Sequence, residues 1–287
     1  MKLLNGKELA DEIKEVVKEK VNELNKKGKN VCLAVIQVGN DKASSVYVKN
    51  KEKACKDCGI ESRVYNLNDD IEPCILEDTI VELIEKLNND DGVDGILVQL
   101  PLPSSIDEKF IINKISPEKD VDSFHEVNVG KLMIGEPKFV PCTTLGIIQL
   151  LIKNDIEIEG KNCVVVGRSN IVGKPTAMEL LRHNGTVTVC HSKTKGLKEI
   201  CKQADILVCA IGKPKFFNKE YISPNTTVID VGIHRLEDGS LCGDVDFDDV
   251  KDIVSAITPV PRGVGAMTVA MLMNNCLRAA IMNYFRQ

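Results

Sequence analysis

Short apolar runs alternate with helical segments along most of the chain, and this alternation constrains the fold more than any other feature. The run from residue 31 to 38 is typical of a buried strand that ends at Gly39. The first half of the chain also predicts strands at about 61–67 and 95–99 and helices at about 43–58, 73–89 and 107–115. Strands joined by crossover helices run parallel, so the pattern predicts an open α/β sheet that binds ligands at the carboxyl ends of its strands.

A second unit repeats the pattern. After a helix at about 143–153, strands are predicted at about 163–166, 187–189, 206–210 and 228–231, which favours a doubly wound, Rossmann-like parallel sheet. A last helical pattern at 267–286 most simply packs back on the first unit. We therefore expect two α/β domains with a cleft between them, one of residues 1–142 plus 267–287 and one of residues 143–266.

The composition excludes several classes of function. Hydrophobic residues make up 43% and charged residues 28%, and a net charge of -5 with an isoelectric point near 5.6 gives no electrostatic reason to expect nucleic acid or an anionic membrane as partner. The N-terminal residues lack the apolar core of a signal peptide, and no apolar run of about 18 residues is evident. We expect a cytoplasmic protein that acts on a small molecule.

The eleven cysteines are expected to be free thiols, because their number is odd and most lie in apolar runs. Cys55 and Cys58 form a Cys-x-x-Cys pair, but no second pair or histidine stands at zinc-site spacing, and the four histidines are scattered. The sequence therefore predicts no metal site.

Tyr47 and Lys51 are the first chemical candidates. They are four residues apart in a predicted helix, so both side chains emerge on one face, whereas Lys49 and Lys53 point away and fit a solvated surface. An aromatic ring can shield an amine from water, and such shielding favours the neutral, basic form of an amine. Lys51 is thus a candidate acid-base catalyst.

Other polar residues follow the predicted strands. Gln99 ends the strand at 95–99, and Asp120 and Asp122 lie just beyond the helix at 107–115. Because the ends of parallel strands meet at one edge, these residues can converge on one site. Each also has a structural alternative: a strand-end amide bonded to backbone for Gln99, and a cap or turn carboxylate for Asp122.

A glycine-rich turn begins the second unit. The strand at 163–166 runs into Gly167-Arg-Ser-Asn-Ile-Val-Gly-Lys-Pro175 and a helix follows, a context in which backbone can approach a pyrophosphate. The spacing Gly-x-Ser-x-x-x-Gly departs from Gly-x-Gly-x-x-Gly, and a tight structural turn is the alternative.

The end of the next strand bears on the choice of dinucleotide. About 20 residues after the glycine-rich turn, an NAD enzyme carries an acidic residue that binds the ribose hydroxyl. At that position this chain has Cys190-His-Ser-Lys-Thr-Lys195 instead of an acid. Its hydroxyl and cationic groups, together with Arg168, could bind the 2′-phosphate of NADP, so the sequence favours NADP over NAD. A polar surface loop without a ligand is the alternative.

These residues together resemble the bifunctional methylenetetrahydrofolate dehydrogenase/methenyltetrahydrofolate cyclohydrolase family over nearly the whole chain. The resemblance rests on several motifs in one order: Tyr47-Val-Lys-Asn-Lys51, Asp94-Gly-Ile-Leu-Val-Gln-Leu-Pro-Leu-Pro103, Pro117-Glu-Lys-Asp-Val-Asp122, Pro141-Cys-Thr-Thr-Leu-Gly146, Val166-Gly-Arg-Ser-Asn-Ile-Val-Gly-Lys-Pro175, His191-Ser-Lys-Thr194, Asp230-Val-Gly-Ile233, Gly243-Asp-Val-Asp246 and Thr258-Pro-Val-Pro261.

The resemblance implies a homodimeric enzyme that oxidises 5,10-methylenetetrahydrofolate with NADP and then hydrolyses the methenyl product to 10-formyltetrahydrofolate. Folate would bind the first domain, with Lys51 catalytic, Gln99 orienting it, Tyr47 stacking on the folate, Asp122 holding the pterin, and Pro259 also in contact. NADP would bind the second domain at Gly167, Arg168, Ser169, Gly173, His191, Ser192 and Ile233. A cationic methenyl group beside Lys51 would itself favour the neutral amine.

The chain departs from the family's pattern at three positions. Ser123, Arg262 and Ala266 stand where the family commonly has glycine, glycine and proline. Arg262 has the largest expected consequence, because a non-glycine residue resists positive φ. Three alternatives stay open: a member with only one of the two activities, another NADP dehydrogenase of similar plan such as a shikimate-dehydrogenase-like protein, and a nucleotide-sensing or scaffold protein without turnover.

Overall fold

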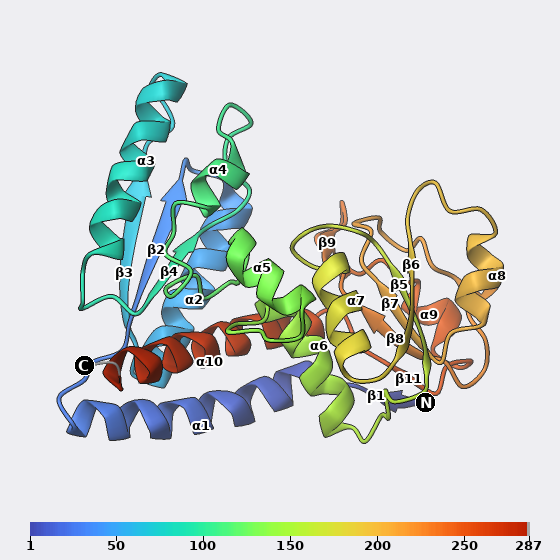
Figure 1. The fold of residues 1–287 in the computed structure, drawn as a ribbon. Coiled ribbons are helices and arrows are strands. Elements are labelled where there is room, and N and C mark those ends of the chain that lie inside the picture. Colours follow the sequence, from blue (N-terminus) through green and yellow to red (C-terminus); the bar gives the residue numbers. More distant parts are fainter. Residues whose placement is uncertain (286–287) are drawn as a thin grey trace. The chain divides into compact units, whose positions relative to one another are not determined.

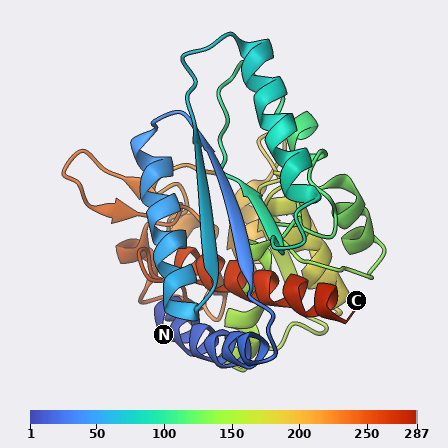
Figure 2. The ribbon, with the colours of Figure 1, turned by 90° about the vertical axis from the view of Figure 1, so that its left-hand side faces the viewer.

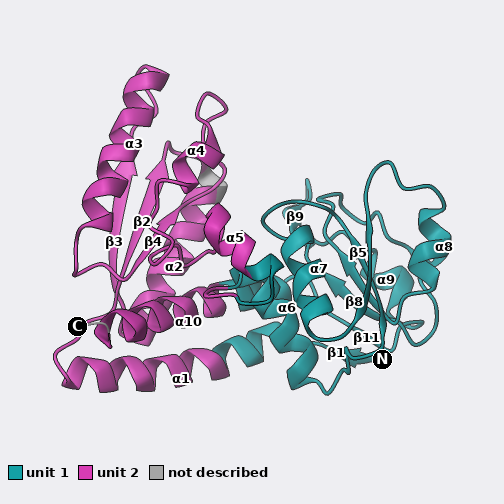
Figure 3. Cartoon of the chain, in the orientation of Figure 1, with its two compact units in different colours: residues 1–11, 132–136, 140–268 teal, residues 12–131, 137–139, 269–287 magenta. Residues whose placement is uncertain are grey.

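The computed structural model describes residues 1–285, apart from the side chains of Lys42 and Ala43. Arg286, at the end of the last predicted helix, and Gln287 lie outside the described residues. Contacts divide the chain into two compact units (Figure 3): unit 1 has residues 1–11, 132–136 and 140–268, and unit 2 has residues 12–131, 137–139 and 269–287. The division falls within the long helices α1 (Gly6–Lys26) and α10 (Val264–Tyr284). Which ligand each part of the chain binds stays a prediction.

Unit 2 is built on a parallel three-stranded sheet in the order β3-β2-β4. Its strands are β2 (Cys32–Val38), β3 (Glu61–Leu67) and β4 (Gly95–Val98), and its helices include α2 (Lys42–Cys58), α3 (Pro73–Asn88), α4 (Glu108–Ile112) and most of α5 (Glu126–Met133). Every residue of β2 is buried, which explains its continuous apolar run. Alternate residues of β2 pack against α3 and α4, while α2 contacts β2 and β3, and Figure 2 shows α2 and α3 on opposite sides of the strands.

Helix α2 has clear signals at both ends. Asp41 accepts a hydrogen bond from the Ser44 N–H at 2.7 Å and so caps the N-terminus. Gly59 ends the helix in the left-handed region, with φ of 74°, and its N–H bonds back to the carbonyl of Lys56. These caps fix the helix that carries Tyr47 and Lys51.

Unit 1 contains a six-stranded, wholly parallel sheet in the order β1-β11-β8-β7-β5-β6 (Figure 1). Its strands are β1 (Lys2–Leu3), β5 (Asn162–Val166), β6 (Thr186–Cys190), β7 (Ile206–Cys209), β8 (Thr227–Asp230) and β11 (Ala256–Ile257). The other elements are α6 (Cys142–Lys153), α7 (Gly173–Arg182), α8 (Leu197–Lys202), the 3-10 helix η1 (Lys219–Tyr221), a hairpin of β9 (His234–Arg235) and β10 (Leu241–Cys242), and α9 (Phe247–Val250).

The strand order of unit 1 reverses at β5. β6 lies on one side of β5 and β7 on the other, so the chain leaves β5 in one direction and returns on the opposite side. In open α/β sheets the crevice at such a switch point is the usual place for a ligand. The glycine-rich turn that follows β5 therefore stands where a dinucleotide would be expected.

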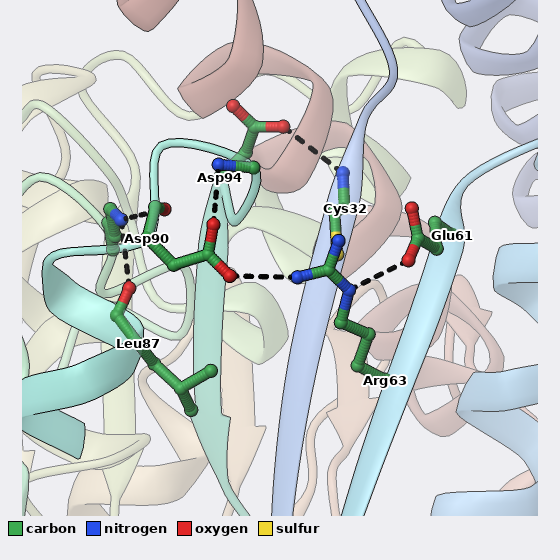
Figure 4. A network of polar contacts seen from close by, with 8 residues as sticks. Cys32, Glu61, Arg63, Leu87, Asp90 and Asp94 are labelled. Carbon is green, nitrogen blue, oxygen red and sulfur yellow. Dashed lines mark hydrogen bonds and ion pairs between the residues drawn. The ribbon is translucent and has the colours of Figure 1, made fainter. Parts of the chain in front are cut away.

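A polar network joins the amino ends of the three strands of unit 2 (Figure 4). Arg63 pairs with Glu61 at 2.7 Å and with Asp90 at 2.9 Å, and the buried Asp94 accepts from the Cys32 N–H at 3.1 Å. Lys29 pairs with the other oxygen of Asp94 at 2.7 Å. These groups lie at the edge opposite the carboxyl ends, so they tie the strands together away from the edge where ligands of open α/β sheets usually bind.

The predicted class, a two-domain α/β protein with a Rossmann-like parallel sheet, is confirmed, with predicted strands of four or more residues found within about two residues of their expected bounds. Several short features were not predicted. They include α5, η1, α9, the β9–β10 hairpin, and the two-residue strands β1 and β11 with their pairing.

Helix α10 is more apolar than the sequence reading suggested. It has 21 residues, and its most apolar stretch has a mean hydropathy of 1.3, which by length and composition is enough to cross a membrane. However, 61% of that stretch is buried inside the protein. A core helix passes the same test, so this feature is weak evidence for a membrane span.

Candidate active site

Lys51 and Gln99 meet in unit 2. The Lys51 Nζ donates a hydrogen bond to the Gln99 Oε1 at 2.9 Å, although 48 residues separate them. Lys51 extends from α2, and Gln99 directly follows β4, with its N–H bonded to the Ile36 carbonyl of β2. The resemblance implied a contact between these two side chains, and the hydrogen bond places them together; their catalytic and orienting roles stay predictions.

The amide of Gln99 is oriented by its own backbone. Its Nε2 donates to the Leu100 carbonyl at 2.6 Å, which leaves Oε1 to face Lys51. The side chain therefore has both a structural bond and a bond to the candidate catalyst. Lys51 is half-buried, while Tyr47, one turn earlier on α2, is 43% exposed and presents a ring to solvent.

Asp120 and Asp122 have different surroundings. Asp120 is buried and accepts from the N–H groups of Phe124 and His125 and from Asn128 Nδ2, at 3.2, 2.8 and 2.8 Å. Burial raises the pKa of Asp120. Asp122 is half-buried, and within residues 1–285 its carboxylate accepts no hydrogen bond. Asp120 therefore has a structural role, and the proposed contact of Asp122 with a ligand stays a prediction.

The turn after β5 is packed backbone against backbone in unit 1. Gly167 has φ of 135°, and a Cβ added to it would lie 2.2 Å from the Ala210 carbonyl oxygen. A Cβ on Gly173 would lie 2.3 Å from the Gly167 oxygen. Both positions thus require glycine. The Ser169 hydroxyl accepts from the N–H groups of Val172 and Gly173 at 3.2 and 3.3 Å and so lies at the N-terminus of α7.

The loop after β6 lies beside this turn, because Val166 and Cys190 are paired at the ends of adjacent parallel strands. The His191 N–H donates to Thr194 Oγ1 at 2.9 Å, and the Lys193 N–H donates to His191 Nδ1 at 3.1 Å. These bonds shape the loop while Ser192, Lys193 and Lys195 stay exposed, as does Arg168. Hydroxyl and cationic groups are therefore free to face an anion here.

Ile233 and Pro259 follow β8 and β11, at the same edge of the sheet. Ile233 is 40% exposed, and its Cδ1 lies 2.6 Å from where a Cβ on Gly265 would be. Pro259 borders a cavity of about 300 Å³ that Asp230 also lines.

Arg262 has φ of 79°, so this arginine adopts the left-handed conformation for which glycine is preferred. Ser123 does the same, with φ of 63°.

Sequence reasoning assigned no role to two buried aspartates in unit 1. Asp230 accepts from the N–H groups of Gly232, Asp244 and Val245, yet burial outweighs these bonds and raises its pKa to about 7. Asp244 accepts from three successive backbone N–H groups and from His234. The one sequence feature that could have pointed to Asp244 was the Gly243-Asp-Val-Asp246 motif, but the spacing of a motif alone does not predict which groups its side chains contact.

The eleven cysteines are free thiols, and ten of them are buried. Burial raises the pKa of the Cys55 thiol to about 12 and that of Cys58 to about 11, so neither is a ready nucleophile. Among the described residues, no group of three or more His, Cys, Asp and Glu side chains could hold a metal ion.

A glycine-rich turn at the switch point of a parallel sheet, together with a lysine–glutamine pair in a second α/β unit, defines a dinucleotide-binding enzyme of two α/β units. Residues 4–122 match the model of the tetrahydrofolate dehydrogenase/cyclohydrolase catalytic domain, and residues 141–284 match that of the NAD(P)-binding domain. The chain belongs to the tetrahydrofolate dehydrogenase/cyclohydrolase family.

Known proteins resemble the chain over nearly its whole length. The bifunctional protein FolD of Agathobacter rectalis is 59% identical over 277 residues, covering 96% of this chain and 98% of the relative. The crystal structure of the bifunctional enzyme FolD, methylenetetrahydrofolate dehydrogenase/cyclohydrolase, from Campylobacter jejuni has a TM-score of 0.95 and 49% identity, covering 98% of this chain and 99% of that one. The Trypanosoma brucei enzyme, solved with NADP and an inhibitor, has a TM-score of 0.92 and 37% identity, covering 98% and 97%.

Proposed function

We propose that this protein is a bifunctional one-carbon folate enzyme. It oxidises 5,10-methylenetetrahydrofolate to 5,10-methenyltetrahydrofolate with NADP and then hydrolyses that product to 10-formyltetrahydrofolate. The observation that carries the proposal is the 2.9 Å hydrogen bond between Lys51 and Gln99, with the exposed Tyr47 one turn before Lys51 on α2. Family membership makes the shikimate-dehydrogenase-like alternative and the scaffold alternative unfavoured.

For the oxidation, the protein has mainly to position the substrate and the cofactor, and no side chain has to take part in the chemical step. NADP would supply the hydride-accepting chemistry when bound, and the part of the protein is to hold the carbon bridge of the folate against it. Tyr47 offers a ring on which the folate can stack, and Asp122 offers a carboxylate without a partner among the described side chains. Pro259, at the rim of a cavity, is the third proposed contact with the substrate.

Hydrolysis requires a base, because water adds to the cationic methenyl carbon and must lose a proton. Lys51 is the proposed base. Gln99 Oε1 directs its Nζ, and the bound cation favours the neutral amine by charge repulsion. The proton that Lys51 accepts from water would pass to the ring nitrogen as the methenyl bridge opens. The remaining hydroxyl proton would be released to solvent as the formyl carbonyl forms, which accounts for the positive charge of the methenyl group.

NADP is the proposed hydride acceptor, and NAD is less favoured. Exposed Arg168, Ser192, Lys193 and Lys195 lie at adjacent strand ends and can pair with a 2′-phosphate, and no acid stands at this position to bind a free ribose hydroxyl. Gly167, Ser169 and Gly173 form the proposed pyrophosphate turn, and His191 and Ile233 complete the proposed contacts.

The decisive experiment is a spectroscopic assay with methylenetetrahydrofolate, run with NADP and with NAD, that follows methenyl absorbance and reduced cofactor together. We expect NADPH to form faster than NADH, with a methenyl signal that rises and then decays. Accumulation of methenyl product without decay, beyond its spontaneous hydrolysis, would instead show a dehydrogenase alone. No reduced cofactor with either dinucleotide would contradict the proposal.

We also infer a homodimer in the cytoplasm, with residues 1–142 and 267–287 serving the folate and residues 143–266 serving NADP. Eleven free thiols fit a reducing compartment. Light scattering of the purified protein tests the dimer, which should have twice the chain mass of 31.6 kDa. A mass equal to that of one chain would contradict it.

A further inference from the structure

Asp244 is a buried carboxylate in unit 1 that no step of the proposed reaction uses. Its Oδ2 accepts from the N–H groups of Ile211 and Gly212 at 2.6 and 3.0 Å, and its Oδ1 accepts from the Lys213 N–H at 2.9 Å. Successive N–H groups that converge on one point form the concave arrangement that binds anions in many proteins. In this chain Asp244 is itself the anion, and it fixes the loop that follows β7.

That loop determines where the glycine-rich turn lies. The Ala210 N–H bonds to the Val166 carbonyl at 2.8 Å, and the Ala210 carbonyl oxygen packs so closely on Gly167 that no Cβ would fit. Gly173 closes the other side of the same turn. Because these contacts are between backbones, a shift of the loop after β7 must move Gly167 with it.

Asp244 also reaches the segment after β8. The His234 Nε2 lies 2.8 Å from Asp244 Oδ1, and His234 directly follows Ile233, a proposed cofactor contact. Asp230 holds Asp244 in turn, because its carboxylate accepts from the Asp244 N–H at 2.9 Å. One side chain therefore links the segments after β7 and β8, and the first of these packs on the turn after β5 through Ala210, where the dinucleotide is proposed to bind.

We propose that Asp244 is a positioning residue for the dinucleotide, holding the loop after β7 and the Ile233 segment so that the glycine-rich turn stays in its binding conformation. It need not contact the cofactor. The proposal rests on the proposed function of this edge as the NADP site. It adds a residue whose role is to set the affinity for the cofactor and which leaves the folate chemistry untouched.

The principal test is Asp244→Asn. The amide keeps the size of the side chain but turns an N–H2 donor toward backbone N–H donors, so at least one bond is lost. We expect the KM for NADP and the Kd for NADPH, measured by calorimetry, to rise roughly tenfold to a hundredfold, the usual effect of losing a charge-assisted hydrogen bond. The KM for methylenetetrahydrofolate and the rate of methenyltetrahydrofolate hydrolysis without NADP should stay at wild-type values, because hydrolysis needs no hydride acceptor.

Two further variants reach the same loop by other routes. In Gly232→Ala the new methyl group would lie 2.4 Å from Asp244 Oδ1 and 2.6 Å from the Asp244 backbone nitrogen, so it should displace the whole of Asp244, carboxylate included, and reproduce the weakened NADP binding. His234→Ala removes one bond and keeps the three from the loop, so the KM for NADP should rise less than in Asp244→Asn.

Asp205→Asn is the matched control. Asp205 accepts from the Asn162 N–H at 2.8 Å, in the same sheet but at the amino ends of the strands. It undergoes the same chemical change away from the turn, so its affinity for NADP should equal that of the wild type. Thermal unfolding of every variant separates loss of stability from loss of binding.

The outcomes are distinct. If Asp244→Asn lowers only the melting temperature, or lowers oxidation and hydrolysis in parallel with an unchanged Kd for NADPH, the residue is merely structural and the proposal is overturned. If the wild-type protein binds no NADPH, the proposed function of this edge fails together with the positioning role. Selective loss of NADP affinity, graded as stated and absent in Asp205→Asn, supports the proposal.

Discussion

Lys51 and Lys53 are two residues apart on α2, yet their surroundings differ. Lys51 is half-buried and donates to Gln99, whereas the side chain of Lys53 is 78% exposed and lies 3.5 Å from Asp57 on the same helix. Helical geometry separates the two side chains onto different faces. Only the first of them has the partner and the partial shelter that acid-base chemistry requires.

Lys51→Ala should greatly slow the hydrolytic step. Loss of a general base typically lowers the rate by about 10² to 10⁴. The measurement is the decay of methenyl absorbance at several pH values, corrected for spontaneous hydrolysis. Lys53→Ala is the control and should match the wild type; near-normal hydrolysis by Lys51→Ala would remove Lys51 from the mechanism.

Arg262→Gly should stabilise the protein. Arg262 has φ of 79°, and a side chain in this region costs about 1–2 kcal/mol, part of which the greater freedom of glycine in the unfolded chain offsets. We expect a net gain of about 0.5–1 kcal/mol in the free energy of unfolding, measured with urea. Ala266→Gly, inside α10, should instead lose about 1 kcal/mol. A destabilised Arg262→Gly would show that the arginine makes compensating contacts.

Asp230 should make stability depend on pH. Its pKa rises from 3.8 to about 7 on folding, so the folded state binds the proton more tightly than the unfolded state. The stabilising contribution is therefore complete below about pH 3.8 and is lost as the pH rises through about 7. Urea unfolding between pH 4 and 8 should show this decline in the wild type and a flatter profile in Asp230→Asn. Identical slopes would mean that the carboxyl is ionised throughout.

Helix α2 illustrates how an element can affect a site through its first turn. Asp41 caps the helix by accepting from the Ser44 N–H, and Tyr47 lies within the next turn. The cap thus supports the residue proposed to stack on the folate. A second capped helix, α4, offers a comparison, because Asp107 accepts from the N–H groups of Lys109 and Phe110.

Asp41→Ala should raise the KM for methylenetetrahydrofolate and lower stability by about 1 kcal/mol, the usual cost of a lost N-cap. Asp107→Ala should lower stability by a similar amount and leave that KM unchanged. The comparison needs kinetic constants and urea unfolding for both variants. Equal KM values in all three proteins would show that the first turn of α2 stays ordered without its cap.

The elements that the sequence predicted are those with long, one-sided or fully apolar patterns. β2, for example, is seven buried residues and was predicted within one residue of its bounds. β1 and β11 have two residues each, too few for any periodicity, and their pairing joins segments that are far apart in the chain. The Lys51–Gln99 contact was predicted only through the family resemblance, because 48 residues separate the two side chains and no local pattern joins them. The bonds of Asp244 were not predicted, because they depend on the path of three loops.

At the scale of the whole molecule, ligand binding and folding are linked. A ligand that binds only the folded chain stabilises it in proportion to the logarithm of its concentration. Unit 1 contributes the whole of the proposed dinucleotide edge, since β5, β6, β7 and β8 all belong to it.

NADPH should therefore raise the melting temperature. At a concentration of about 100 times its Kd, it should add about 2.7 kcal/mol to the free energy of unfolding. Thermal unfolding with NADPH and with NADH makes the comparison, and NADH at the same concentration should give a smaller shift. Equal shifts would contradict the preference for the phosphorylated dinucleotide.

The close packing of Gly167 between Ala210 and Gly173 also limits how this protein can change. Gly167 and Gly173 lack room for one methyl group, so these two positions cannot carry a side chain that alters the choice between dinucleotides. Variation that switches cofactor should instead accumulate at the exposed positions Arg168, Ser192, Lys193 and Lys195, where side chains can be exchanged without disturbing the sheet.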